Sequence, residues 1–372
     1  MRVLFDHQIF SYQRFGGASR YFAELMRVFH EQGDPQFDLG VATSPNAYLA
    51  AAQYYRGRTT GAIAGTPRFF ATYARNVVQT RLAARRPHDV FHATFYSPDA
   101  LGSARGSRLV VTVLDMIPER FPEAFDLHGL YGRFVTKRWI ETKRVMCERA
   151  AGILAISENT KQDIVELYGI PAERIVVTHL GNRLTGSREQ AKPRGFPDRY
   201  VLFVGTRNTY KNFGLVLEAL AQIPDVALAC IGGGPFDDGE KARIAKHGLG
   251  DRVTQRNVSD DEMGACYAHA EAFVFPSRYE GFGIPILEAF ACGCPALLAR
   301  ASCFPEIAGD AALYFDPDEA DELRAALVRV LEDRTLADRL RALGHARARE
   351  LTWESTAART AAAYRDMVGR SP

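Results

Sequence analysis

Residues 273–295, which read FVFPSRYEGFGIPILEAFACGCP, constrain the fold of this chain more than any other stretch. They begin with an apolar run that is typical of a buried strand in a parallel sheet. A loop with Glu280, Gly281 and Gly283 follows, and Pro285 stands where the first turn of a helix favours proline. A strand, a glycine loop and a helix start form the repeating unit of nucleotide-type α/β folds, in which anions bind at the helix start.

Two carboxylates stand beside this predicted anion site. Glu280 is in the loop, and Glu288 falls in the first turn of the predicted helix. Carboxylates repel phosphate but accept hydrogen bonds from sugar hydroxyls. We therefore predict a ligand with phosphate at its centre and hydroxyls on both sides, as in a nucleoside diphosphate sugar. The plainer alternative is a solvated Glu280 and a Glu288 that only favours the helix dipole.

The stretch PSRYEGFGIPILEAFACGCP resembles the signature of the retaining glycosyltransferases of family 4, in which two glutamates eight positions apart flank a glycine loop. The resemblance extends over nearly the whole chain. It implies the GT-B fold, an α/β architecture of two Rossmann-like, doubly wound domains that face each other across a cleft. It also implies that Glu280 holds the sugar and Glu288 the ribose. The other donor-binding residues implied in this loop are Gly281, Phe282, Gly283 and Ile284.

The length of 372 residues exceeds one ordinary hydrophobic core and indicates two domains. Residues 184–198, LTGSREQAKPRGFPD, are polar and rich in glycine and proline, which is typical of a linker. We expect an acceptor-binding domain over residues 1–190 and a nucleotide-sugar-binding domain over residues 191–352. The resemblance implies that a last helix, within residues 353–372, crosses back to cover the first domain.

Charge and cysteine usage narrow the class of protein. A formal net charge of +2 gives no indication of nucleic-acid binding. The opening MRVLFDHQIF has only a short apolar run, so we expect neither a signal peptide nor a membrane span, and a cytoplasmic protein. Six scattered cysteines are typical of buried side chains in a reducing compartment. The late cluster of Cys292, Cys294 and Cys303 matches no zinc spacing, so we expect no metal site.

Residues 67–88, PRFFATYARNVVQTRLAARRPH, contain five arginines, no acidic residue, and apolar side chains at helical spacing. A helix of this kind, over residues 68–86, would suit the anionic cytoplasmic face of a membrane. It would equally suit a helix that packs its apolar face on the domain and leaves its arginines in water. A second basic helix, residues 131–150, also contains Glu141 and Glu148, and we predict that it forms a solvated face.

The first domain opens with a strand, then Gly16 and Gly17, then a helix, which predicts a phosphate crevice; a plain tight turn is the alternative. The resemblance places this loop close to the sugar and its phosphates. Two more predicted strands end in polar residues, His92 on one and Asp115 after the other. The segment VTVLDMIPERFPEAF is similar to family 4 enzymes of surface polysaccharide assembly, where histidine often precedes the aspartate. Here Leu114 does, so Asp115 becomes the predicted polar group beside the sugar, with His92 as a second candidate.

In the second domain, the loop GTRNTYKN places Arg207 and Lys211 after a predicted strand. Negative charge builds on a departing diphosphate, and fixed cations stabilise it more than they stabilise the ground state. We expect these cations to replace a divalent metal, so that no cofactor is needed; two solvated loop cations are the alternative. Lys211 matches the family lysine, whereas Arg207 is offset from the family arginine. The resemblance also assigns Val258 to a turn whose main chain touches the base.

These observations predict a retaining, metal-independent glycosyltransferase that uses Arg207, Lys211, Glu280 and Asp115 as catalytic residues. The sugar transferred would be a hexose or deoxyhexose, and the resemblance to the polysaccharide subgroup implies GDP-mannose as the first choice of donor. The same resemblance implies a lipid-linked or growing glycan of O-antigen, lipopolysaccharide or another surface polysaccharide as the acceptor. A nucleotide-sugar epimerase of the same architecture is an alternative, as is a binding protein or membrane scaffold without catalysis. A nicotinamide-dependent oxidoreductase is a further alternative, although the first loop lacks the third glycine of the dinucleotide fingerprint.

Overall fold

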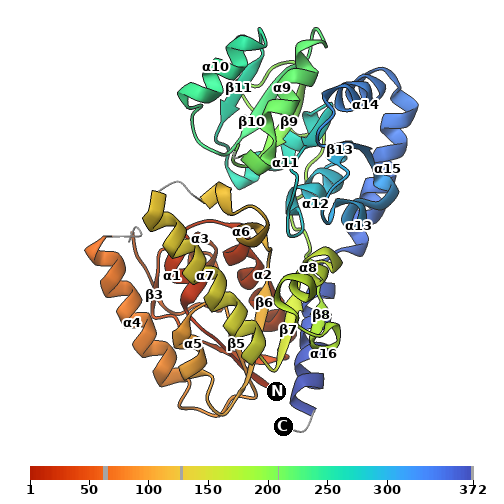
Figure 1. Ribbon diagram of the computed structural model, residues 1–372. Coiled ribbons are helices and arrows are strands. Elements are labelled where there is room, and N and C mark those ends of the chain that lie inside the picture. Colours follow the sequence, from red (N-terminus) through yellow and green to blue (C-terminus); the bar gives the residue numbers. More distant parts are fainter. Residues whose placement is uncertain (62–65, 126–128, 208, 370–372) are drawn as a thin grey trace. The chain divides into compact units, whose positions relative to one another are not determined.

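The computed structural model describes residues 1–61, 66–125, 129–207 and 209–369 (Figure 1). Asn208 of the predicted diphosphate loop and the last three residues of the predicted helix segment lie outside these ranges. The chain divides into two compact units, Met1–Leu180 with Trp353–Pro372, and Gly181–Thr352. The first unit therefore ends before residue 190, where the linker composition suggested a boundary. The reason is that the segment after Leu180 packs on the second unit, as when Arg188 Nε donates to the carbonyl of Ala268 over 2.9 Å.

The first unit is built on a six-stranded parallel sheet in the order β2-β1-β5-β6-β7-β8. Its strands are β1 (Arg2–Phe5), β2 (Gln36–Leu39), β5 (Val90–Ala93), β6 (Arg108–Val113), β7 (Gly152–Ala155) and β8 (Ile175–Val177). A separate pair consists of β3 (Thr43–Ser44) and β4 (Arg58–Thr59). The central strands are buried almost throughout, as expected for a sheet with helices on both faces.

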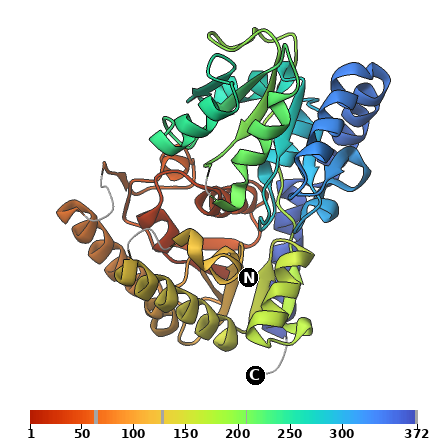
Figure 2. The same cartoon turned by 45° about the horizontal axis from the view of Figure 1, so that its top comes forward.

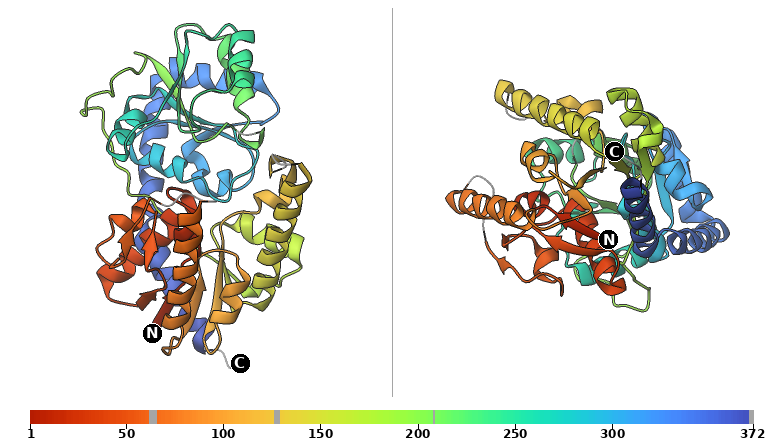
Figure 3. Two further views of the ribbon diagram at one scale, coloured as in Figure 1. Left: turned by 90° about the vertical axis from the view of Figure 1, so that its left-hand side faces the viewer. Right: turned by 90° about the horizontal axis from the view of Figure 1, so that it is seen from below.

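Helices cover both faces of this sheet, and the last helix of the chain is one of them (Figure 3). They are α1 (Gln8–Tyr12), α2 (Gly17–Gln32), α3 (Ala47–Ala50), α4 (Pro67–Ala83), α5 (Pro98–Ser103), α6 (Ile117–Arg120), α7 (Gly129–Arg149), α8 (Glu158–Tyr168) and α16 (Trp353–Gly369), with 3-10 turns η1 (Pro122–Phe125) and η2 (Ala172–Arg174). Helices α2 and α16 contact each other, and Trp353 and Tyr364 of α16 are fully buried. The sequence around 353 is therefore part of the first hydrophobic core.

The second unit repeats the design with a parallel sheet in the order β11-β10-β9-β12-β13-β14. Its strands are β9 (Tyr200–Val204), β10 (Ala227–Ile231), β11 (Val253–Arg256), β12 (Ala272–Phe275), β13 (Ala296–Ala299) and β14 (Ala312–Phe315). Its helices are α9 (Phe213–Ala221), α10 (Asp238–Lys246), α11 (Asp260–His269), α12 (Ile284–Ala291), α13 (Phe304–Ala308), α14 (Ala320–Glu332) and α15 (Arg334–Glu350), with 3-10 turns η3 (Thr209–Lys211) and η4 (Gly309–Ala311).

In both sheets the strand order reverses at the first strand, with β1 between β2 and β5, and β9 between β10 and β12. Two doubly wound, Rossmann-like sheets confirm the predicted α/β fold class. The reversal matters for function, because ligands of open parallel sheets bind beyond the carboxyl ends of the strands at this point.

Two predicted features of composition can be compared with the fold. All six cysteines are buried and unpaired. Across the described ranges, no helix combines the length and the apolar character needed to cross a membrane.

Candidate functional site

Lys211 and Glu280 meet at the carboxyl edge of the second sheet. Lys211 ends the turn that follows β9, and Glu280 lies in the loop between β12 and α12. Because β9 and β12 are parallel neighbours, their following loops lie at the same edge. Lys211 Nζ donates to Glu280 Oε1 over 2.5 Å, and the two side chains are 13% and 12% exposed. The structure thus brings together two of the residues predicted from separate motifs.

Hydrogen bonds from neighbouring segments fix the backbone around this ion pair. The amide of Arg278 donates to the carbonyl of Tyr210 over 2.8 Å, which joins the two loops. The Ser302 hydroxyl donates to the carbonyl of Glu280 over 2.6 Å. The buried Cys303 thiol lies 3.3 Å from the same oxygen and 3.2 Å from that of Phe282. The sequence prediction did not identify Ser302 or Cys303, because supports of this kind leave no spacing pattern near the motif that they hold.

The glycine loop leads into α12 through Gly283, which has a φ of 89° and caps the helix. A Cβ at this position would lie 3.2 Å from the Phe275 ring and 3.3 Å from the Phe304 ring, so a larger residue would disturb the loop. The neighbouring loop residues Gly281 and Phe282 are buried, whereas Ile284 is half-buried at the helix start. The loop is therefore rigid where the prediction requires close approach by a phosphate.

Glu288 lies just beyond the first turn of α12, in which the sequence prediction had placed it, because the helix begins at Ile284. It is buried and accepts a hydrogen bond from the Tyr267 hydroxyl over 3.1 Å. Burial and the adjacent Glu288 carboxylate raise the pKa of Tyr267 well above its ordinary value, so this hydroxyl stays a donor. The bond from Tyr267 fixes the orientation of Glu288 from α11.

Arg207 has contacts that differ from those predicted. Its side chain is 1% exposed and forms an ion pair with Glu240 of α10, with Nε to Oε1 at 2.7 Å. The two terminal nitrogens donate to the carbonyls of the glycine turn after β10, which are those of Gly232, Gly233, Gly234 and Pro235. All three guanidinium nitrogens are therefore engaged within the protein. These contacts do not support a diphosphate-binding role for Arg207, and they instead make it the clamp of that turn.

The turn that Arg207 clamps is a run of three glycines, which lets another group approach its backbone closely. Gly232, Gly233 and Gly234 all have φ between 70° and 86°, which side chains rarely adopt. Val258 lies between β11 and α11, next to the Ser259 cap, and is half-buried. The turn and Val258 thus follow β10 and β11, two neighbouring strands on one side of Lys211.

In the first unit, Gly16 and Gly17 stand at the start of α2 as predicted. Gly17 is the first helical residue, and Gly16 precedes it. The Gln13 side chain occupies the helix start, because its Oε1 accepts from the amide of Ser19 over 3.2 Å. A Cβ on Gly16 would lie 2.5 Å from the same oxygen. A neutral side chain thus caps the helix start that the sequence suggested for phosphate.

His92 is fully buried in β5 and does not reach the edge of the sheet. Its Nε2 lies 2.8 Å from the Thr112 hydroxyl, and its Nδ1 lies 2.5 Å from the hydroxyl of Tyr364 in α16. Burial lowers the pKa of His92 to about 3, so the imidazole is neutral. The prediction of a ligand-binding His92 is therefore wrong in position, and the residue instead attaches α16 to the sheet.

Asp115 follows β6 at the edge of the first sheet and is half-buried, like the preceding Leu114. Its Oδ1 accepts from the amide of Ile117 over 3.1 Å, which caps the turn into α6. The carbonyl of Asp115 accepts from Lys143 Nζ over 3.1 Å, and this buried ammonium pairs with Glu119 at 2.8 Å. Sequence reasoning missed Lys143, which looks like any other cation of a basic helix.

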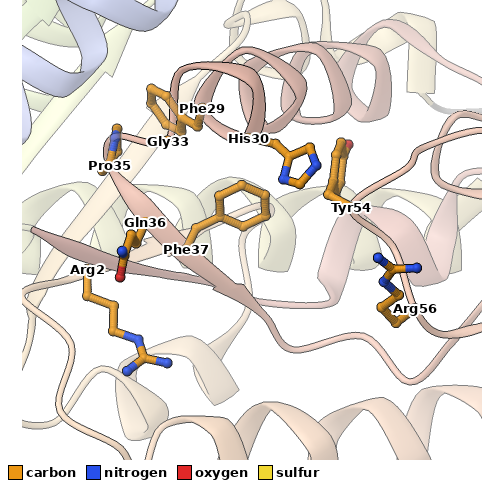
Figure 4. Close-up of a pocket in the computed structure, with 9 residues that line it drawn as sticks. All are labelled: Arg2, Phe29, His30, Gly33, Pro35, Gln36, Phe37, Tyr54 and Arg56. Carbon is orange, nitrogen blue, oxygen red and sulfur yellow. The ribbon is translucent and has the colours of Figure 1, made fainter.

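The hollow of the first unit that is drawn in Figure 4 lies away from this edge. It has a volume of about 400 Å³ and is lined by residues near the starts of β1 and β2 and the end of α2. Its Arg2 pairs with Asp38 at 2.8 Å, and its His30 and Tyr54 rings contact each other. It sits at the amino ends of the strands, so it is not the candidate site. Among the residues that the structure describes, no group of three His, Cys, Asp or Glu side chains is placed to hold a metal.

Two family models match the two halves of the chain. The model described as glycosyltransferase family 4 matches residues 15–183, and the one described as glycosyl transferases group 1 matches residues 187–347. The Lys211–Glu280 pair, Glu288 and Val258 all lie within the second match.

Curated relatives match about three fifths of the chain. O-antigen chain mannosyltransferase B of Escherichia coli is 31% identical over 57% of this chain and 60% of its own length. The MMP α-(1→4)-mannosyltransferase of Mycolicibacterium hassiacum is 30% identical over 63% of this chain and 60% of its own length. The chain thus matches about 60% of the length of each relative.

Solved structures resemble the whole chain at lower identity. The sucrose-phosphate synthase of Thermosynechococcus elongatus is 20% identical, with a TM-score of 0.74 over 100% of this chain and 99% of the other. The Anabaena protein HepE, solved with UDP and glucose, is 18% identical, with a TM-score of 0.72 over 97% of this chain and 98% of the other. At this identity the likeness supports the fold alone.

Proposed function

This chain belongs to the GT-B glycosyltransferases, and we propose that it transfers mannose from GDP-mannose to a lipid-linked or growing surface glycan with retention of configuration. The observation that carries the proposal is the Lys211–Glu280 pair, at 2.5 Å, beside the glycine loop and the start of α12. A cation, a carboxylate and a helix start in one place match the phosphate and the hydroxyls of a sugar nucleotide. The names of both relatives support mannose as the sugar, and the name of the O-antigen relative supports a surface glycan as the acceptor.

In the proposed reaction, the bond between the anomeric carbon and the β-phosphate oxygen breaks, and its electron pair leaves with the diphosphate. Lys211 binds the departing phosphate and stabilises its growing charge. The acceptor hydroxyl forms the new bond on the same face of the sugar, and its proton passes to the leaving phosphate oxygen. Glu280 accepts hydrogen bonds from the sugar hydroxyls, and Glu288 accepts them from the ribose.

Binding of the donor has to separate Lys211 from Glu280. Each is the other's partner in the described structure, with little exposure to water. A phosphate replaces the carboxylate at Lys211, while sugar hydroxyls replace the ammonium at Glu280. Both charged groups therefore have a partner before and after the donor binds, so neither charge is left unpaired in the free protein.

The proposal needs no metal or cofactor, because the fixed ammonium of Lys211 and the amides at the start of α12 supply positive charge at the diphosphate. Asp115 of the first unit remains a proposed polar contact on the side of the sugar. We assign Arg207 to the base-binding side, where it clamps the triple-glycine turn.

A lipid-linked acceptor also implies that the enzyme acts at the cytoplasmic face of a membrane. Helix α4 supports this, because Phe70, Val78 and Leu82 are 62%, 56% and 48% exposed on a helix rich in arginine. Buried Phe69, Asn76 and Thr80 attach the opposite face of α4 to the domain. The buried side chains agree with a helix that packs on the domain, and the exposed apolar side chains support the proposed membrane contact of residues 68–86.

The test is thermal stabilisation by free nucleotides and sugar nucleotides, because a ligand that binds only the folded state raises the unfolding midpoint. GDP and GDP-mannose are expected to raise the midpoint of the wild type. Lys211→Ala should lose the response, and Lys241→Ala, an exposed lysine of α10, is the matched control.

Each other outcome assigns a different function. Stabilisation by UDP in place of GDP would overturn the donor and keep the enzyme class. Stabilisation by a nicotinamide cofactor alone would favour the oxidoreductase. Conversion of the sugar nucleotide to its epimer, without transfer to any acceptor, would favour the epimerase.

A further inference from the structure

The two glutamates of the proposed donor site have different kinds of partner. Glu280 pairs with the ammonium of Lys211, which the diphosphate of the donor would take over. Glu288 accepts from a neutral group, the Tyr267 hydroxyl, with Oε2 at 3.1 Å. A hydroxyl donor does not neutralise a carboxylate and does not have to leave when a ligand arrives. The bond between Tyr267 and Glu288 can therefore persist in the bound state, unlike the pair at Glu280.

Tyr267 is enclosed inside the second unit. Its side chain is fully buried, and its ring contacts the Phe273 ring of β12 edge-on, with 5.6 Å between the centroids. Burial and the neighbouring Glu288 carboxylate raise the pKa of the phenol well above its ordinary value, so the hydroxyl keeps its proton. Tyr267 is therefore a permanent hydrogen-bond donor in a fixed place.

The backbone on both sides of Tyr267 is held by other segments. The Tyr200 hydroxyl of β9 donates to the carbonyl of Cys266 over 2.7 Å. Arg188 Nε donates to the carbonyl of Ala268 over 2.9 Å. A side chain can orient its neighbour only if its own position is fixed, and these two bonds fix the end of α11.

Helix α12, which carries Glu288, is held by α15 as well as by α11. It contacts both helices, and Figure 2 shows α15 (blue) at one side of the second unit. The approach of α15 is close, because a Cβ on Gly344 would lie 2.8 Å from the Phe290 ring. A dense interior of this kind does not let either helix shift freely, so the hydroxyl and the carboxylate keep one geometry.

We propose that Tyr267 is a positioning residue for ribose recognition: it holds Glu288 in the orientation that accepts from ribose hydroxyls, so that the site selects nucleotides that carry them. This inference rests on the proposed function, which assigns Glu288 to the ribose, and extends it to a buried residue that does not touch the ligand. A site built to bind hydroxyls rejects an analogue that lacks them, because that analogue covers the buried acceptor and offers it no donor.

The experiment measures binding of GDP and of 2′,3′-dideoxy-GDP to the full chain by titration calorimetry. The wild type is expected to bind GDP about tenfold or more tightly than dideoxy-GDP, because hydrogen bonds to a charged group are among the stronger ones. Tyr267→Phe keeps the buried ring and removes the donor. It should lower the affinity for GDP by about fivefold to tenfold and change that for dideoxy-GDP by less than about twofold. The retained dideoxy-GDP affinity also shows that the variant is folded.

Tyr200→Phe is the matched control. It removes another buried hydroxyl that bonds to α11, one residue before Tyr267, and leaves the bond to Glu288 in place. It should keep the wild-type preference for GDP. Once Glu288→Ala has removed the carboxylate, adding Tyr267→Phe should not lower GDP affinity further, as expected for a residue that acts only through Glu288.

The outcomes separate this inference from the proposed function. If Tyr267→Phe weakens both nucleotides equally, or neither, the hydroxyl has no role specific to ribose and the inference is overturned. A wild type that binds GDP and dideoxy-GDP equally would overturn it too and would contradict the ribose role of Glu288, while a GDP response that depends on Lys211 would still support the transferase. If the wild type binds UDP in place of GDP, the donor base is wrong, and the same comparison with 2′,3′-dideoxy-UDP tests Tyr267.

Discussion

The two units have the same architecture but use the carboxyl edges of their sheets differently. In the second unit, the loops after β9 and β12 hold Lys211 and Glu280, which pair with each other and are partly exposed. In the first unit, the polar groups that follow β6 are engaged within the protein. Lys143, for example, is 1% exposed and pairs with Glu119.

The difference shows that two domains with the same fold need not both have a ligand-binding site at the same place. Polar residues after a strand indicate a ligand site only when the folded chain leaves them a surface. Arg207 and Lys211 show this within one loop, since they are four positions apart. One is enclosed by the carbonyls of a turn, and the other reaches the edge.

The largest expected effect is on stability, at Arg207. Arg207→Ala should lower the free energy of unfolding by about 3–5 kcal/mol, because Glu240 would be left buried without its cationic partner. Denaturant unfolding measures this. The double variant Arg207→Met with Glu240→Leu should recover part of the loss, since it leaves no buried unpaired charge but lacks the hydrogen bonds of both side chains. If Arg207→Ala has wild-type stability but no longer responds to GDP, Arg207 binds the diphosphate as the sequence predicted.

The next effect is on turnover, at Lys211. Lys211→Ala should lower kcat by about 100-fold to 1000-fold, as is typical when one group that stabilises charge in the transition state is removed. Its stability should change less than that of Arg207→Ala, because its ion pair is more exposed. Transfer from GDP-mannose, followed by release of GDP, is the measurement. A variant that kept kcat and raised only KM would place Lys211 in ground-state binding.

His92 should make the first unit sensitive to acid. Its pKa falls from 6.5 to about 3 on folding, so below about pH 6.5 the unfolded chain binds a proton that the folded chain does not. Stability is therefore lost as the pH falls from about 6.5 toward 3, by about 1.4 kcal/mol for each pH unit. His92→Gln should reduce this slope in denaturant unfolding, while Tyr364→Phe should keep it. An unchanged slope in His92→Gln would show that His92 is not the group responsible.

The smallest expected effect is at Asp115. Asp115→Ala should cost about 1 kcal/mol through loss of the bond from the Ile117 amide, whereas Asp115→Asn keeps an acceptor there and should be near neutral. Both are measured by denaturant unfolding. If Asp115→Asn is stable but loses transfer activity, the carboxylate of Asp115 takes part in the reaction. Both units would then have functional side chains at the carboxyl edges of their sheets.

Most of the fold followed from local patterns. Strands β1, β9, β12 and β14 are apolar runs that end at glycine, proline or polar residues, and such runs predict buried parallel strands. Helix α8 also has sequence signals at both ends, the Ser157 cap and Gly169 at a φ of 67°. The end of the first unit could not be predicted in this way. A polar, glycine-rich composition fits an extended segment that packs on a domain surface as well as it fits a linker.

The candidate site was predictable where a motif sets the geometry and not where distant residues do. The spacing of Glu280 and Glu288 and the position of Lys211 after a strand were sufficient to select them as candidates, and the structure brings Lys211 and Glu280 together. Nothing near Arg207 in sequence indicates Glu240, which is on another helix. Nothing near His92 indicates Tyr364, which arrives from the end of the chain. Residues distant in sequence decide whether a polar side chain is free to bind a ligand or is already engaged within the protein. A single sequence does not show which distant residues come into contact.

The return of α16 to the first unit affects the order in which the protein can fold during synthesis. Residues 181–352 are continuous, so the second unit can close while translation proceeds. The first unit, begun earlier, lacks α16 until Trp353 and Tyr364 emerge from the ribosome. Until then, Tyr21 and Phe29 of α2 lack the rings that cover them in the finished protein. The part made first is therefore completed last, and its uncovered aromatic surface is where a chaperone would bind the nascent chain.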